Sequence, residues 1–173
     1  MYATTVARRV QAPPAAVYRA LLDPDAVAAW RVPAGMTARV HEFDPREGGG
    51  FRVSLTYDDP GHPGKSGART DTYRGHFARL VPDELVVEVI EFETGDEALG
   101  GAMTMTTSLT AVDGGTGGGP EAGTDGGSKA GTGGWTDVVI RHEGVPDAVP
   151  REDNARGTRM ALDNLARLVE GTA

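Results

Sequence analysis

The sequence predicts an α+β domain with an antiparallel sheet of about seven strands, two short helices after the first strand and one long C-terminal helix. Three observations support this fold class. Residues 51–57 alternate apolar and polar side chains, as a strand with one buried face does. The predicted strands between residues 36 and 112 are joined by short connections, which is typical of antiparallel pairing. Residues 152–170 place their apolar side chains on one helical stripe.

The N-terminal region is predicted to hold one strand and two short helices. Residues 3–10 favour a strand, which ends at two consecutive prolines because proline cannot donate to a strand ladder. Residues 14–22 then repeat apolar side chains at helical spacing. Asp23 is placed to cap a second helix that begins at Pro24 and ends near Trp30.

The remaining strands are bounded by turns rich in proline and glycine. They are predicted at residues 36–43, 51–57, 71–80, 85–92, 103–112 and 135–142. The helix at 152–170 would be about 28 Å long at 1.5 Å per residue. It is therefore long enough to lie across a small sheet.

One segment departs from this pattern. Half of the residues from 113 to 134 are glycine, with no aromatic or large aliphatic side chain to bury, which indicates a flexible loop insertion. A linker between two domains is the alternative, but the part of the chain after Gly134 is too short for a core of its own. We therefore expect a single domain over residues 1–173.

Composition argues against several classes of function. The net charge is -8 with a pI near 4.9, and the basic residues are scattered, so we expect no nucleic-acid partner. No apolar run is long enough for a membrane span or a secretory signal, so we expect no membrane association. The sequence has no cysteine, which favours a cytoplasmic location.

Motifs for nucleotide binding, metal binding and nucleophilic catalysis are not found. The four histidines are His41, His62, His76 and His142, and none has the spacing of a zinc site on a helix. We predict neither a metal nor a cofactor. If the protein were an enzyme, His76, His142 or Tyr73 would be the acid or base.

A family resemblance adds to this interpretation. The matching residues are Asp23-Pro24 with Trp30, Asp44-x-Arg46-x-Gly48-Gly49, Gly75 with Pro82 and Leu85, and Gly157 with Leu162 and Leu165. In this order, from about residue 4 to 170, the sequence resembles the activator of Hsp90 ATPase homologue 1-like family of the START/Bet v 1-like (SRPBCC) helix-grip superfamily. The resemblance implies a curved sheet wrapped around the long helix, with an apolar cavity between them. Arg31 and Thr158 stand where relatives often carry tryptophan.

The same resemblance suggests which residues would line that cavity. The predicted ligand-binding residues are Trp30, Phe51, Val53, Leu55, Tyr57, Tyr73, Val87, Val89, Met103, Met105, Ile140, His142, Thr158 and Leu162. Trp30 is expected at the cavity mouth, and Gly157 where the sheet or a ligand approaches the helix closely. A fully packed core is the alternative interpretation of the apolar members.

Three functions are compatible with these features. The first is binding of a small hydrophobic molecule in the internal cavity, with no specific reaction. The second is a cyclase-like or dehydratase-like enzyme acting in the same cavity. The third is a module that activates an Hsp90-type ATPase, which we rank last because the eukaryotic activators of the family have two domains. We expect binding rather than catalysis.

Overall fold

The computed structural model describes residues 1–113 and 134–171. In chain order the elements are β1 (Tyr2–Val10), α1 (Pro14–Leu21), α2 (Pro24–Trp30), β2 (Met36–Phe43), β3 (Gly50–Tyr57), β4 (Thr70–Val81), β5 (Leu85–Phe92), β6 (Met103–Val112), β7 (Trp135–Val145) and α3 (Arg151–Val169). The predicted fold class is confirmed, and so are the two short helices after the first strand.

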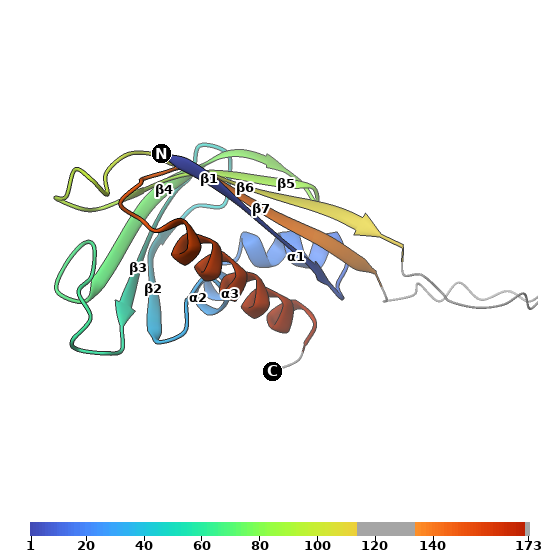
Figure 1. Cartoon of the computed structure of the whole chain (residues 1–173). Coiled ribbons are helices and arrows are strands. Elements are labelled where there is room, and N and C mark those ends of the chain that lie inside the picture. The colour runs from blue at the N-terminus through green and yellow to red at the C-terminus, as the bar shows by residue number, and fades with distance from the viewer. Residues whose placement is uncertain (114–133, 172–173) are drawn as a thin grey trace, which may run out of the picture.

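The strands form one antiparallel sheet in the order β1-β7-β6-β5-β4-β3-β2. Strands β2 to β7 each pair with their neighbours in sequence. Strand β1 pairs with β7, so the first and the last strand of the chain are neighbours in the sheet. All three helices lie on the same side of the curved sheet (Figure 1). We call the side that they cover the inner face and the opposite side the outer face.

Local sequence explains where the short helices begin. Pro14 and Pro24 occupy first helical positions, where the missing N–H group costs nothing. The Asp23 side chain accepts hydrogen bonds from the backbone N–H groups of Asp25 at 2.8 Å and Ala26 at 3.2 Å, as its predicted role as N-cap requires. The two helices are thereby separated by a sharp turn at residues 22 and 23.

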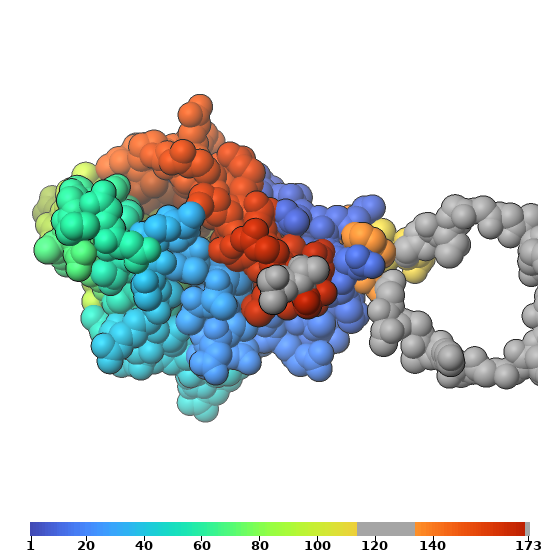
Figure 2. Space-filling model, turned by 90° about the horizontal axis from the view of Figure 1, so that it is seen from below, coloured from blue at the N-terminus to red at the C-terminus, as the bar shows by residue number. Residues whose placement is uncertain are grey.

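Helix α3 closes the inner face. Its buried side chains are Leu162, Leu165 and Ala166. It packs against β1, α1 and α2, and Arg8 of β1 forms an ion pair with Asp163. Figure 2 shows α3 in red on the helix-covered side of the molecule, beside the blue N-terminal helices. No helix within residues 1–113 and 134–171 is both long and apolar enough to cross a membrane.

Most of the predicted glycine-rich insertion at 113–134 lies outside the described residues, so its flexibility stays a prediction. The strands on either side of it are paired, with Val112 opposite Trp135. Strand β7 lies between β1 and β6 and supplies the buried residues Val138 and Ile140. The chain after Gly134 therefore contributes to the same core as the chain before it.

One predicted face assignment was wrong. Glu88 of β5 lies directly opposite the buried Met105 of β6, and opposed residues in an antiparallel pair share a face. Val87 and Val89 therefore lie on the outer face, not on the concave face where we expected them. The inner face of β5 carries Glu88 instead, between two apolar residues.

Candidate functional site

A row of opposed residues crosses the inner face below the helices. Thr4 of β1 lies opposite His142 of β7, His142 opposite Met105 of β6, and Met105 opposite Glu88 of β5. Side chains in such a row project to the same side and lie close to one another. The sheet therefore brings a hydroxyl, an imidazole, a thioether and a carboxylate into one interior line.

Arg31, the C-cap residue of α2, contacts two members of this row, Glu88 and Met105. Its guanidinium donates to the Glu88 carboxylate at 2.9 and 2.5 Å and contacts the Met105 sulfur at 3.4 Å. The side chains of Arg31 and Glu88 are only 13% and 7% exposed, so this is a buried, bidentate ion pair. Burial lowers the pKa of Arg31, but the bonded Glu88 carboxylate opposes that effect and keeps the guanidinium protonated.

The position of Arg31 is fixed by its surroundings. The guanidinium lies 5.3 Å from the Trp30 ring and 5.8 Å from the Tyr73 ring, within cation–π range of both. The Asn164 amide of α3 donates to the backbone oxygens of Trp30 at 3.3 Å and Val32 at 2.9 Å. The long helix thus holds the segment that carries Arg31.

Tyr73 supplies an unpaired hydroxyl to the same region. The residue is buried, and its hydroxyl makes no hydrogen bond of normal geometry to any described residue, although the Arg31 guanidinium lies nearby. Burial raises the pKa of Tyr73, and Arg31 opposes that shift only in part. The group therefore stays protonated and can donate. An unsatisfied buried hydroxyl costs about 1–3 kcal/mol.

His142 supplies the second unpaired group. Its Nδ1 lies 3.1 Å from the Asn154 amide nitrogen, and the Asn154 amide oxygen accepts from the Thr4 hydroxyl at 2.5 Å. Its Nε2 is buried and has no partner among the described residues. Burial, with a smaller effect from the positive Arg31, lowers the pKa of His142 to about 4. The imidazole is neutral at physiological pH.

The pKa values of His142 and Tyr73 are both shifted away from neutral pH. A base with a pKa of about 4 and a phenol with a raised pKa both exchange protons poorly near neutral pH. The other proposed acid or base, His76, is exposed and lies opposite Val89 on the outer face. The described residues contain no group of three or more possible metal ligands.

The structure places the predicted ligand-binding residues in several different environments. Eight of them belong to the buried core: Trp30, Phe51, Val53, Tyr73, Met103, Met105, Ile140 and Leu162. Leu55 packs against that core, and Tyr57 stacks on His62 at the end of β3 with ring centroids 3.9 Å apart. The Thr158 hydroxyl bonds the Asn154 carbonyl within α3 at 3.0 Å. Val87 and Val89 are separated from the rest by the sheet.

Of these predicted residues, the structure brings Trp30, Tyr73, Met105 and His142 together around Arg31. Sequence reasoning missed Glu88, Asn154 and Thr4 as members of the site. Arg31 itself could be noticed, as a charge where relatives often carry an aromatic ring. Its partner could not, because Glu88 is 57 residues away and sits in an otherwise apolar strand.

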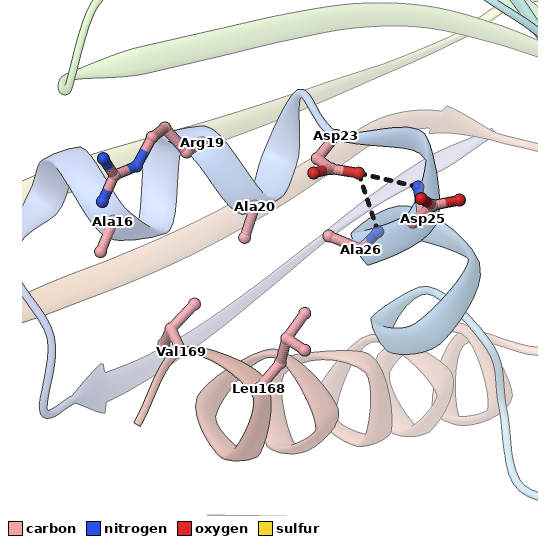
Figure 3. Close-up of a pocket in the computed structure, with 8 residues that line it drawn as sticks. All are labelled: Ala16, Arg19, Ala20, Asp23, Asp25, Ala26, Leu168 and Val169. Carbon is pink, nitrogen blue, oxygen red and sulfur yellow. Dashed lines mark hydrogen bonds between the residues drawn. The ribbon is translucent and has the colours of Figure 1, made fainter. Parts of the chain in front are cut away.

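A hollow on the surface lies apart from this interior cluster. It has a volume of about 510 Å³ and is lined by Ala16, Arg19, Ala20, Asp23, Asp25, Ala26, Leu168 and Val169, from α1, α2 and the end of α3 (Figure 3). None of the predicted ligand-binding residues lines it. We base the candidate site on the interior cluster, because that is where buried polar groups lack partners.

Comparison with protein families gives a match over the larger part of the chain. The model described as Activator of Hsp90 ATPase homolog 1-like protein matches residues 11–117, which is more than half of the chain. This match ends before β7 and α3. A comparison with curated proteins gave no significant match.

Solved structures extend the similarity over nearly the whole chain. A crystal structure of a protein from Chromobacterium violaceum is 29% identical and covers 98% of this chain and 99% of its own, with a TM-score of 0.75. An NMR structure of a protein from Staphylococcus epidermidis is 13% identical and covers 99% and 91%, with a TM-score of 0.70. A Rhodobacter sphaeroides crystal structure is 18% identical and covers 99% and 95%, with a TM-score of 0.70. The last two show the fold alone.

Proposed function

The chain belongs to the activator of Hsp90 ATPase homolog 1-like family, and on that premise we propose that it binds a small, mostly apolar molecule between the inner face and α3. The observation that carries this proposal is the pair of buried polar atoms without partners, the Tyr73 hydroxyl and His142 Nε2. Buried polar groups normally find partners within the protein, so two orphans in one interior suggest an external partner.

The surroundings of these atoms support an apolar occupant. Core residues from β3, β6, β7 and α3 provide the walls, and the two methionines among them adapt to varied shapes. Arg31, at the end of α2, remains partly accessible to solvent, since its side chain keeps 13% of its surface exposed. Movement of Arg31 and Met105 would open the interior to a ligand.

A thermal-shift panel tests the proposal. Fatty acids, aromatic polyketide-like compounds and sterols are added to the purified protein, and hits are measured by calorimetry. A ligand at about 100 times its Kd stabilises the folded state by about 2.7 kcal/mol, which would raise Tm by about 5–10 °C in a chain of this size. A flat response across all three classes contradicts the proposal.

Two variants of β7 locate the binding site. Ile140 faces the interior and Val139 faces outward, so Ile140→Phe fills the proposed site while Val139→Phe is its matched control. We expect binding to be lost only in Ile140→Phe. Met105→Phe provides a second interior variant if the first does not fold. Equal binding by the inner-face and outer-face variants would place the ligand elsewhere.

Activation of an Hsp90-type ATPase is the second candidate function, favoured by the family match itself. A pull-down with the chaperone and an ATPase assay would test it. Stimulation of hydrolysis that persists in Ile140→Phe would assign the activity to the surface rather than the interior. No change in the rate excludes this candidate.

A cytoplasmic location is part of the first proposal. The absence of cysteine from the sequence is compatible with a reducing compartment. Fractionation of cells that express the tagged chain would test the location.

A further inference from the structure

The hydrogen-bonding state of the two orphan atoms indicates what chemistry they would recognise. The Tyr73 hydroxyl is protonated, so it can donate a hydrogen bond. The state of His142 follows from its contacts with Asn154 and Thr4. These contacts decide whether Nε2 carries a proton.

The Asn154 side chain fixes the tautomer of His142. The contact of 2.5 Å between the Thr4 hydroxyl and Asn154 is the length of an O–H···O bond and too short for a usual N–H···O bond. The amide oxygen therefore faces Thr4, and the amide nitrogen faces His142 Nδ1 at 3.1 Å. An amide nitrogen only donates, so Nδ1 accepts and the proton of the neutral ring lies on Nε2.

The charges in the site are already balanced, which argues against a net charge on the bound ligand. Arg31 is already neutralised by a bidentate bond to Glu88. His142 and Tyr73 are uncharged, and Tyr73 and Glu88 are buried. A carboxylate would add an uncompensated negative charge to this interior, whereas an uncharged acceptor oxygen would accept from either donor without that cost.

We infer that the occupant is an uncharged carbonyl compound, a ketone, ester, lactone or amide on an apolar body, whose oxygen atoms accept from His142 Nε2–H and the Tyr73 hydroxyl. This inference rests on the proposed function and names the class of ligand. A pure hydrocarbon leaves both donors unsatisfied. A free fatty acid brings the wrong charge.

Ligands of matched shape test this directly. One set is 2-acetylnaphthalene, 2-ethylnaphthalene and 2-naphthoate; the other is methyl octanoate, nonane and octanoate. Their affinities are measured by calorimetry at pH 7. We expect the ketone and the ester to bind at least about tenfold more tightly than the hydrocarbon and the carboxylate of their set, since a buried hydrogen bond is of that strength.

The outcomes separate this inference from the proposed function. If hydrocarbon or carboxylate binds as tightly as the carbonyl compound, the interior binds ligands and the inference is wrong. If no member of either set binds, and the wider thermal-shift panel is also flat, the proposed function itself fails. If only the wider panel yields ligands and none carries an uncharged carbonyl, the inference is again wrong.

Substitution of Tyr73 and His142 tests whether these two side chains recognise the carbonyl group. Tyr73→Phe removes a hydroxyl that makes no hydrogen bond of normal geometry and keeps the ring beside Arg31, so the variant should fold and lose part of the preference for the carbonyl compound. His142→Phe should reduce the preference to about that of a hydrocarbon. Tyr2→Phe is the matched control, because the Tyr2 hydroxyl bonds the Val149 carbonyl at 2.7 Å outside the site. An unchanged preference in Tyr73→Phe and His142→Phe would overturn the assignment.

Nitrogen NMR of the histidine rings measures the tautomer without any substitution in the site. We expect His142 to carry its proton on Nε2 and its Nε2–H signal to shift when the ketone binds. Asn154 is a positioning residue. Without its amide, the proton of His142 is no longer fixed on Nε2, so Asn154→Leu should bind the ketone more weakly and the hydrocarbon as tightly as before. A proton on Nδ1 in the unaltered protein, or an equal loss of both affinities in Asn154→Leu, contradicts the inference.

Discussion

Arg31 and His142 lie on the same inner face but carry charge differently. The guanidinium stays charged because Glu88 bonds it through both oxygens. The imidazole stays neutral because it is buried without a counterion and lies near the positive Arg31. Arg31 therefore links the end of α2 to β5, whereas the neutral His142 has an Nε2–H group without a partner among the described residues.

The neutral state of His142 predicts a specific dependence of stability on pH. Its pKa falls from 6.5 to about 4 on folding, so between these values the unfolded chain binds a proton that the folded chain does not. Acid therefore favours unfolding in this window. Between pH 7 and pH 5 the free energy of unfolding should fall by about 2 kcal/mol more in the natural protein than in His142→Gln.

Urea denaturation of both proteins at the two pH values measures this difference. The variant serves as the control, since it keeps all other titrating groups. Identical losses of stability on going to pH 5 would show that His142 is not held neutral by the fold.

The buried ion pair predicts non-additive mutational effects. Arg31→Met leaves the Glu88 carboxylate buried and uncompensated, which should destabilise the protein by about 3–5 kcal/mol. In Arg31→Met with Glu88→Leu, apolar side chains replace the whole pair, and most of that loss should be recovered. Denaturation of the two single variants and the double variant gives the coupling free energy between Arg31 and Glu88. If the double variant loses as much free energy of unfolding as the two single variants together, the two side chains are not directly paired.

Single-residue features were the hardest to predict from the sequence. Strand 85–92 has one set of alternating residues with Leu85, Val87 and Val89, and another with Val86, Glu88 and Ile90. The uniformly apolar set was the natural choice for the inner face. The structure reverses it because Arg31 supplies the counterion that lets Glu88 be buried, and that pairing has no local signal.

At the level of elements, two glycines have opposite roles. Gly75 of β4 lies where a Cβ atom would be 2.1 Å from the Val89 carbonyl oxygen and 2.7 Å from the Phe51 ring. Gly157 of α3 has nothing within 4 Å of that position. The close approach of the sheet to Gly157 that we expected from sequence is absent, and the close approach occurs at Gly75.

Alanine substitution at both glycines tests this contrast. Gly75→Ala should destabilise the protein by about 1–3 kcal/mol, since the strand or the Phe51 ring must shift. Gly157→Ala should stabilise it by about 0.5–1 kcal/mol, because alanine favours a helix and meets no obstacle. Thermal and urea unfolding measure both. Similar effects of the two substitutions would contradict the packing at Gly75.

The existence and type of every element followed from local patterns. The alternation in residues 51–57, the proline positions and the Asp23 cap are short-range signals. Signals of this kind place the ten elements of residues 1–113 and 134–171 within a few residues of their bounds. Strand ends were less certain: β7 runs to Val145, beyond the predicted end at residue 142. This extension pairs with Tyr2 of β1, which the local sequence does not show.

At the scale of the whole molecule, we expect the glycine-rich segment to be dispensable for folding, because the ends of β6 and β7 on either side of it are paired. Val112 and Trp135 lie opposite each other, so a short turn can join them. Replacing residues 114–133 by a turn of about four residues should raise the free energy of unfolding by about 1.5 kcal/mol through loop-closure entropy. Denaturation checks this. Failure of the shortened chain to fold would contradict the single-domain interpretation.

The global arrangement was predictable because short connections leave few ways to order the strands. The family resemblance added the closure of the sheet by α3, and the structural relatives agree with it. The contents of the interior were not predictable in the same way. They depend on which side chains from five elements meet around Arg31.

Calorimetric titration of the protein with 2-acetylnaphthalene, run in parallel on Ile140→Phe and Val139→Phe, tests the central claim most directly. We expect saturable binding of one molecule per chain in the natural protein and in Val139→Phe, and none in Ile140→Phe. Equal binding by all three proteins would contradict a ligand site between the inner face and α3.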